Sequence, residues 1–326
     1  TFSTVLNTNL SDNLKLDWGM TFKRSNTHYF KTVKDLLGGE YWYDIDQFAE
    51  RDFASTPSKY QSDLNNPYRV VKKGDRYGYD YEAIVQDFTE WVMLNGMFHK
   101  FDFYTGLRFG NQSFFRKGNY KKGLFPDNSY GNSDEKSFFH YALKGGFTYK
   151  ISGRHYLSAN AAYMENAPNF TSAFVSPRTR NTAIDNMVTE KVWSGDLSYH
   201  FRSPFIKGRL TGYYTRIDDQ TKILSFYDDF YRSFGNYIMT GIDTEHTGLE
   251  FGMEAKLSPT FTAQGMLGYG QNKYISNPNY VQTVDNTEAI LESDRVYWEN
   301  FNVEGTPMTV ASLGITYNSP KFWWVG

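Results

Sequence analysis

The sequence has no cysteine and only 10 prolines in 326 residues. Without cysteine, disulfide scaffolds, thiolate metal sites and cysteine nucleophiles are excluded. The chain also lacks any apolar run of about 18 residues, the length that a helix needs to cross a bilayer. Its mean hydropathy of -0.59 is too polar for a bundle of membrane helices. A helical membrane protein is therefore excluded.

The sequence also has no large excess of positive or negative charge, and it contains no catalytic motif. The 34 basic and 36 acidic residues leave a net charge of -2, and no basic run occurs, so nucleic acid is not expected as a partner. There is no GxSxG elbow, no phosphate-binding lysine loop and no dinucleotide-binding glycine motif. The six histidines are scattered, with no pair at the spacing of a zinc site. The sequence predicts no enzyme activity, no catalytic residue and no metal centre.

Aromatic residues and strict alternation are abundant instead. Aromatic residues make up 18% of the chain. Between Leu14 and Lys23 every second residue is apolar, which places the apolar side chains on one face of a strand. Further alternating runs occur at 101–109, 141–150, 155–163, 197–202, 209–217, 249–257, 261–270 and 310–317. This pattern is typical of a transmembrane barrel, in which lipid-facing and lumen-facing residues alternate.

Short links and long links alternate between the runs. The short links lie at 11–13, 99–100, 152–154, 203–204 and 258–259, and the long ones at 31–79, 117–133, 166–186, 228–236 and 277–307. Outer-membrane barrels have short periplasmic turns and long extracellular loops. We therefore predict an all-β fold: a segment of a transmembrane antiparallel β-barrel, with about twelve strands and long extracellular loops. One short helix is expected at Lys31–Leu37, before a glycine pair.

A resemblance to a known family lies in the segment from Glu165 to Asn181, with the residues ENAPNF and AFVSPRTRN. This segment resembles one found in TonB-dependent receptors, particularly those of Bacteroidetes-type bacteria. The stretches at 35–46, 213–229 and 305–325 are similar to the same group and follow in the same order. The resemblance implies a 22-stranded barrel that is closed by an N-terminal plug domain.

The same resemblance implies a function, a location and partners. An energy-coupling complex, TonB-ExbB-ExbD, would act on the plug to import an iron chelate, cobalamin, an oligosaccharide or a peptide across the outer membrane of a Gram-negative bacterium. Both ends of the sequence lie within strand-like patterns, so residues 1–326 would be a partial barrel domain without the plug and the C-terminal strands. Outer-membrane lipid and a surface lipoprotein that lids the barrel would be further partners.

Four polar residues of the family-like segment are candidates for contact with ligand or plug: Asn169, Arg178, Arg180 and Asn181. Arginine is well suited to this role because its planar guanidinium binds carboxylates with two hydrogen bonds. A salt bridge or cap that stabilises the loop is the competing interpretation. Both interpretations stay open at this stage.

Aromatic residues in or beside the long links are candidates for ring stacking on a ligand. The candidates are Tyr41, Trp42, Tyr43, Tyr297 and Trp298, together with the tyrosines of 77–81 and 227–231. Packing of the loops, or a girdle at the membrane interface, explains the same residues. The acidic residues Asp44, Asp46, Asp218, Asp219, Asp228 and Asp229 offer oxygen ligands for Ca²⁺. None has the spacing of a calcium loop, so solvated carboxylates and no cofactor are expected.

Two other classes of protein share these features. A passive porin or adhesin barrel would have the same strands but no plug domain. A secreted carbohydrate-binding β-protein would have a similar composition, and a propeller of that kind would repeat every 40 to 50 residues. No such repeat occurs in this chain.

Overall fold

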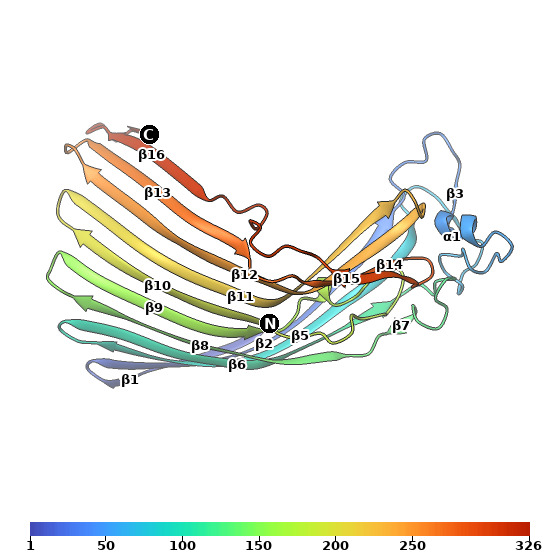
Figure 1. The fold of residues 1–326 in the computed structure, drawn as a ribbon, viewed down its shortest axis with the longest axis horizontal. Helices are drawn as coiled ribbons and strands as arrows, with labels where there is room; N and C mark the ends of the chain where they lie inside the picture. The colour runs from blue at the N-terminus through green and yellow to red at the C-terminus, as the bar shows by residue number, and fades with distance from the viewer.

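The computed structural model describes all residues, 1–326, and is dominated by one curved antiparallel sheet (Figure 1). Twelve strands form its main path: β1 (Phe2–Ser11), β2 (Leu14–Thr32), β5 (Arg76–Met97), β6 (Phe101–Gly118), β8 (Lys136–Lys150), β9 (His155–Asn166), β10 (Glu190–Arg202), β11 (Ile206–Asp228), β12 (Ser233–Lys256), β13 (Phe261–Tyr274), β16 (Thr309–Asn318) and β17 (Trp324–Val325). They pair in chain order, as in a barrel wall. The predicted all-β fold is confirmed.

The remaining elements are short and lie in the connections at one end of the sheet. They are β3 (Trp42–Tyr43), α1 (Gln47–Asp52), β4 (Val70–Val71), β7 (Gly131–Asn132), the 3₁₀ turn η1 (Phe170–Ser172), β14 (Asn279–Val284) and β15 (Ile290–Arg295). The opposite end carries the short turns, such as the one between β1 and β2 (Figure 1). None of the helices is both long and apolar enough to cross a membrane.

The two faces of the sheet differ in polarity because the register keeps like residues together. On the convex side one row runs through Val92, Leu107, Leu143, Tyr163 and Trp193, on five consecutive strands. Leu143 and Trp193 are 55% and 51% exposed although they are apolar. Such a row is stable where lipid, not water, surrounds it.

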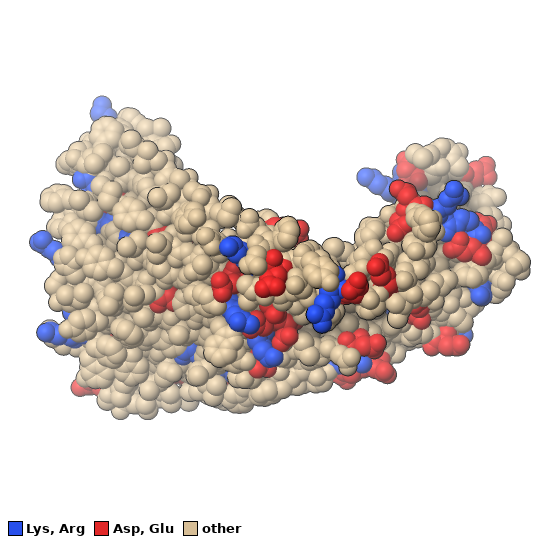
Figure 2. All heavy atoms as spheres, viewed as in Figure 1, with Lys and Arg blue, Asp and Glu red and all other residues tan.

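The inner face is polar along the same strands. Asn95 donates a hydrogen bond to Asp17, Lys150 forms an ion pair with Asp102, and Asn160 donates to Asp196. Figure 2 shows few charged side chains over the half of the strands next to the turns, and many over the middle and the loop end. About ten residues of a strand are enough to cross a bilayer, and the turn-side half of the strands has few charged side chains over such a length (Figure 2).

Several details differ from the sequence-based expectations. The helix predicted at Lys31–Leu37 is wrong: Lys31 and Thr32 extend β2 by pairing with β5, and the helix forms at Gln47–Asp52 instead. Asp46 starts that helix, because its side chain accepts hydrogen bonds from the N–H groups of Phe48 and Ala49.

The prediction of a long link at 228–236 is also wrong. Strand β11 ends at Asp228, β12 begins at Ser233, and a tight turn joins them. Strand β5 lies between the links expected at 31–79 and 99–100, but no alternating run was found in it. Its inner face carries Ala83, Val85, Trp91 and Met93, which remove the alternation that identified the other strands.

An apolar cluster fixes the connection 167–189 against the inner face. Phe170, Ala173 and Phe174 of this connection pack on Phe114 of β6 and Tyr81 of β5. Phe114 and Ala173 have no exposed surface, and Phe174 is only 1% exposed. The burial of several aromatic rings stabilises this arrangement by a few kcal/mol for each ring. The segment from Glu165 to Asn181, which carries the family resemblance, therefore packs on the concave inner face of the sheet, at the end where the long connections lie.

Candidate ligand pocket among the long loops

A cavity of about 440 Å³ lies where the connections 33–75, 119–135 and 167–189 meet the inner face of the sheet. Its walls include tyrosines of β5, the start of α1 and the segment 174–179. Tyr77, Tyr79 and Tyr81 follow one another along β5 and all line the cavity. Phe174 of the connection 167–189 and Phe234 of β12 add further rings. The cavity is therefore partly aromatic and open toward the loop end.

Two cations lie beside one of these tyrosines. The Nζ atom of Lys31 is 4.4 Å from the ring centre of Tyr77 and 5.8 Å from that of Tyr79. The guanidinium carbon of Arg178 is 5.7 Å from the same Tyr79 ring. No side-chain hydrogen bond or ion pair holds Lys31 or Arg178. Burial lowers the pKa of Lys31, the acids Asp46 and Asp44 partly oppose this effect, and the positive charge of Arg178 adds to it.

A third cation, Lys122, lines the cavity and is almost fully buried. Lys122 is only 5% exposed, and its Nζ atom donates a 2.6 Å hydrogen bond to the backbone oxygen of Gly78. No carboxylate forms an ion pair with Lys122. Burial lowers the pKa of Lys122, and the more distant acids Asp46 and Asp44 oppose this effect. A buried ammonium without a direct counter-ion costs free energy, unless an anion is nearby.

The acidic residues of the cavity, in contrast, already have partners. Asp46 caps α1 through two 3.1 Å hydrogen bonds from backbone N–H groups. Asp285 accepts hydrogen bonds from Arg180 at 3.0 Å and from Asn236 at 3.2 Å. The cavity is therefore lined by three cations that form no ion pair, Lys31, Lys122 and Arg178, and by two carboxylates. Asp285 is in an ion pair with Arg180, whereas the negative charge of Asp46 acts on Lys31 and Lys122 without a direct contact. The net unpaired charge of the cavity is positive.

The structure separates the four polar residues of the family-like segment. Arg178 lines the cavity, whereas Arg180 is 1% exposed and forms ion pairs with Asp285 at 3.0 Å and Glu288 at 2.7 Å. Asn181 accepts a hydrogen bond from Arg116 and also holds the loop together. Asn169 is exposed at the start of η1 and makes no side-chain cap.

The aromatic candidates are separated in a similar way. Trp42 lines the cavity, while Tyr41 and Tyr43 are exposed and pack edge to face on each other at 6.0 Å. Tyr297 is 73% exposed, and Trp298 packs on Tyr274 with a centroid distance of 4.8 Å. Neither residue of this second pair lines the cavity.

Sequence patterns did not identify Lys31 or Lys122 as site residues. Lysines are frequent in the long connections, and only tertiary folding separates the enclosed ones from the solvated ones. No three His, Asp or Glu side chains come together in a way that could hold a metal ion. Asp44 and Asp46 instead accept hydrogen bonds from Gly78 and from the start of α1.

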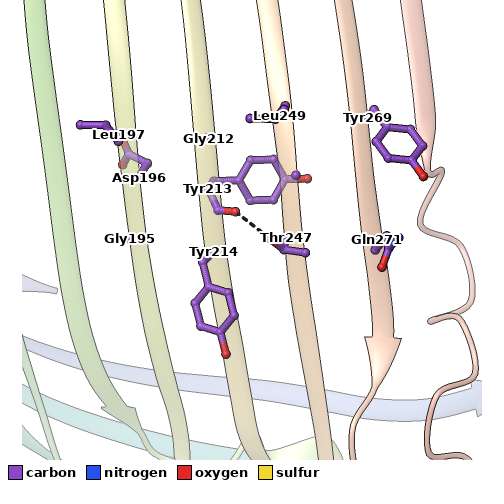
Figure 3. A pocket seen from close by; sticks show the side chains of 11 residues that line it. Gly195, Asp196, Leu197, Gly212, Tyr213, Tyr214, Thr247, Leu249, Tyr269 and Gln271 are labelled. Carbon is purple, nitrogen blue, oxygen red and sulfur yellow. Dashed lines mark hydrogen bonds between the residues drawn. The ribbon is translucent and has the colours of Figure 1, made fainter.

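A second hollow lies on the sheet itself, over β10 to β13 (Figure 3). Gly195 and Gly212 carry no side chain there, so a depression remains between Leu197 and Leu249. Asp196 belongs to the inner face, where Asn160 donates two hydrogen bonds to its carboxylate. The hollow is open, apolar and within the lipid-facing belt. Gln271 and Tyr269 are among its few polar lining residues.

Solved structures provide the comparison with known proteins. The chain is similar to the copper transporter OprC, with a TM-score of 0.57 and 14% identity, over 94% of this chain and 46% of that chain. It is similar to the FrpB iron transporter from Neisseria meningitidis, with a TM-score of 0.57 and 10% identity, over 97% and 40%. It is also similar to the siderophore receptor PiuA from Acinetobacter baumannii, with a TM-score of 0.53 and 12% identity, over 97% and 52%.

These similarities define the fold of the chain. The three proteins are transporters or receptors and not enzymes, and this chain shares their β-barrel architecture. It spans about half of their length or less. No protein-family model and no curated protein matches the sequence.

Proposed function

We propose that the chain forms part of the barrel of an outer-membrane receptor that imports a nutrient by energy coupling. The observation that carries this proposal is the inward-folded connection 167–189. It packs on the inner wall through Phe170 and Phe174 and leaves a lined cavity beside Arg178. A cavity at the extracellular end of a barrel is well placed to hold a ligand before passage. The similarity to metal transporters and a siderophore receptor supports the same proposal.

The proposal includes the parts that the family resemblance implies. A plug domain would close the barrel, and the TonB-ExbB-ExbD complex would act on that plug from the inner membrane. The receptor would be of the Bacteroidetes type, with a surface lipoprotein as lid and outer-membrane lipid around the apolar belt. The exposed apolar row through Leu107 and Leu143 supports the contact with lipid.

Fractionation and uptake experiments test this function. The protein is expected in the outer-membrane fraction, with electrophoretic mobility that changes on heating because barrels resist detergent when unheated. Uptake of its nutrient is expected to stop when a protonophore collapses the proton gradient. Uptake that continues without the gradient would identify a passive porin. Recovery as a soluble protein would reject the membrane location and support a secreted β-protein.

A further inference from the structure

The cavity among the long loops contains an imbalance of charge that the fold does not resolve. Lys31 and Arg178 both lie within 6 Å of the Tyr79 ring centre. Their like charges repel each other, and the acids Asp46 and Asp44 offset this effect on Lys31 without forming an ion pair with it. Neither cation has a carboxylate partner, although Asp46 and Asp285 line the same cavity. Both carboxylates are held by other donors.

We infer that this cavity binds an anionic ligand that carries a ring, with the acidic group of the ligand between Lys31 and Arg178. An acidic group between two cations converts their repulsion into two attractive contacts. Arg178 supplies a planar fork for the acidic oxygens, and Lys31 supplies a compact ammonium. The ligand ring would lie beside Tyr77 and Tyr79, which line the cavity next to the two cations.

Two enclosed groups support the same inference. The buried residue Lys122 lines the cavity and adds a third positive charge to it. The hydroxyl oxygen of Ser62 also lines the cavity, is buried and has no hydrogen-bond partner. A bound acidic oxygen is an acceptor that a hydroxyl group can satisfy. Buried polar groups without partners are costly, so a ligand that pairs with them gains affinity.

The surrounding loops hold the two cations in place before any ligand arrives. Lys31 lies at the end of β2, where it pairs with Tyr77 of β5. Arg178 follows the aromatic cluster that anchors Phe174 on the inner wall. Because both backbones are fixed, little ordering of the chain is needed on binding. The inference rests on the proposed function, because it identifies the class of the imported nutrient.

The test is a binding titration on the full chain purified in detergent micelles. The probe is phthalate, an aromatic dianion, and its neutral counterpart is dimethyl phthalate. Saturation-transfer NMR gives the dissociation constant of each probe. Phthalate is expected to bind, with an affinity that falls as salt is added. The neutral diester is expected to bind at least about tenfold more weakly, because it cannot form the charged contacts.

Variants identify the residues that carry the binding. Lys31→Gln and Arg178→Gln are each expected to weaken phthalate binding by about tenfold or more. Arg178→Lys keeps the charge without the fork and should fall between the wild type and Arg178→Gln. Lys73→Gln is the matched control, because Lys73 is an exposed lysine of the connection 33–75 that follows Lys31 and does not line the cavity. Its affinity is expected to equal that of the wild type.

The outcomes separate this inference from the proposed function. Equal binding of phthalate and its diester, no phthalate binding, or wild-type affinity in both glutamine variants would overturn the anionic ligand, even for a protein found in the outer membrane. Selective phthalate binding by a protein that is not located in that membrane would retain the anion site and reject the transport function.

Discussion

At the scale of single residues, Arg116 joins three segments of the chain at the loop end of β6. Its guanidinium donates to the backbone oxygens of Pro177 at 2.6 Å and Ser129 at 2.9 Å, and to the side chain of Asn181 at 2.5 Å. Arg116 is only 1% exposed, and burial lowers its pKa to about 10. It therefore stays charged at neutral pH and holds the cavity-forming connections together.

Replacing Arg116 with methionine should loosen these connections without removing the barrel wall. Three buried acceptors lose their donor, at a cost of about 3 kcal/mol in local stability. Amide exchange over residues 170–181 should therefore be about 100-fold faster. The neighbouring cation Arg178 provides the control, because it forms no hydrogen bond, so Arg178→Met should leave exchange unchanged. Equal exchange in all three proteins would show that Arg116 is not the anchor.

Asp80 gives the loop end of β5 a defined pH dependence. Its carboxylate accepts hydrogen bonds from His28 at 2.5 Å, Asn119 at 2.7 Å and Arg76 at 2.9 Å. Burial alone would raise the pKa of Asp80, but these three donors outweigh it and lower the pKa. A depressed folded pKa contributes stability that is present above the unfolded pKa of about 3.9, and that is lost as the pH falls through the folded value.

Asp80→Asn should therefore increase amide exchange at the start of β5 at neutral pH. The difference from the wild type should shrink as the pH falls through the lowered pKa of Asp80, because the wild-type carboxyl group then becomes protonated as well. Exchange rates corrected for their intrinsic pH dependence measure both effects. Asp134→Asn is the control, because Asp134 is exposed and its carboxylate has no partner. A difference that stays constant with pH would contradict the assignment to this ionisation.

At the scale of elements, alternation predicted the strands whose two faces differ in polarity. It failed for β5, because Ala83 and Val85 face the loop core and make both faces apolar. It also failed at Asp228 and Ser233, where a strand pair projects into solvent and its turn resembles a loop in sequence. Alternation of apolar and polar residues identifies a strand only when one face is apolar and the other is in contact with water. It therefore fails where a connection packs on the inner face of the sheet and makes that face apolar as well.

The same limit applies to the candidate pocket. Arg178 was identified from its local segment and lines the cavity, whereas Arg180 was identified in the same way and is held in ion pairs. Lys31 and Lys122 are 91 residues apart in the sequence and meet only because the connections fold on each other. No pattern of spacing could have placed these two lysines at one site.

Helix α1 connects the first long connection to the hairpin of β11 and β12. Phe48 packs edge to face on Phe234 with a centroid distance of 5.4 Å, and it lies 5.8 Å from Tyr227. Asn286 donates a 2.8 Å hydrogen bond to Asp52 at the end of the same helix. These contacts close one side of the cavity.

Phe48→Ala should release this side, at a cost of about 2 kcal/mol for a half-buried ring. The chain has no cysteine of its own, so spin labels can be attached at Glu50→Cys and Asp229→Cys without other changes. The distance distribution between the labels should broaden in Phe48→Ala. Tyr41→Ala, which changes an exposed ring of the same connection, should leave it narrow. An equally narrow distribution in Phe48→Ala would mean that other contacts hold the helix.

At the scale of the whole molecule, the difference between the faces of the sheet distinguishes a membrane barrel from a soluble sheet. Met266 and Leu267 are neighbours in β13 and are 51% and 52% exposed. Leu267 pairs with Phe251 and Ala311 on the apolar side, while Met266 pairs with Gly252 and Ser312 on the inner side. Water on both sides would make the two positions equivalent, whereas lipid on one side makes them different.

This contrast predicts the result of placing arginine at each position. Leu267→Arg should destabilise the folded barrel by about 2 to 4 kcal/mol, because the charge would enter the middle of the lipid-facing belt. Met266→Arg should cost much less, because its side chain faces the polar interior. Refolding into vesicles, followed by electrophoresis with and without heating, measures the folded fraction of each variant. Equal losses would place both faces in the same solvent, and a smaller loss for Leu267→Arg would place lipid on the opposite face.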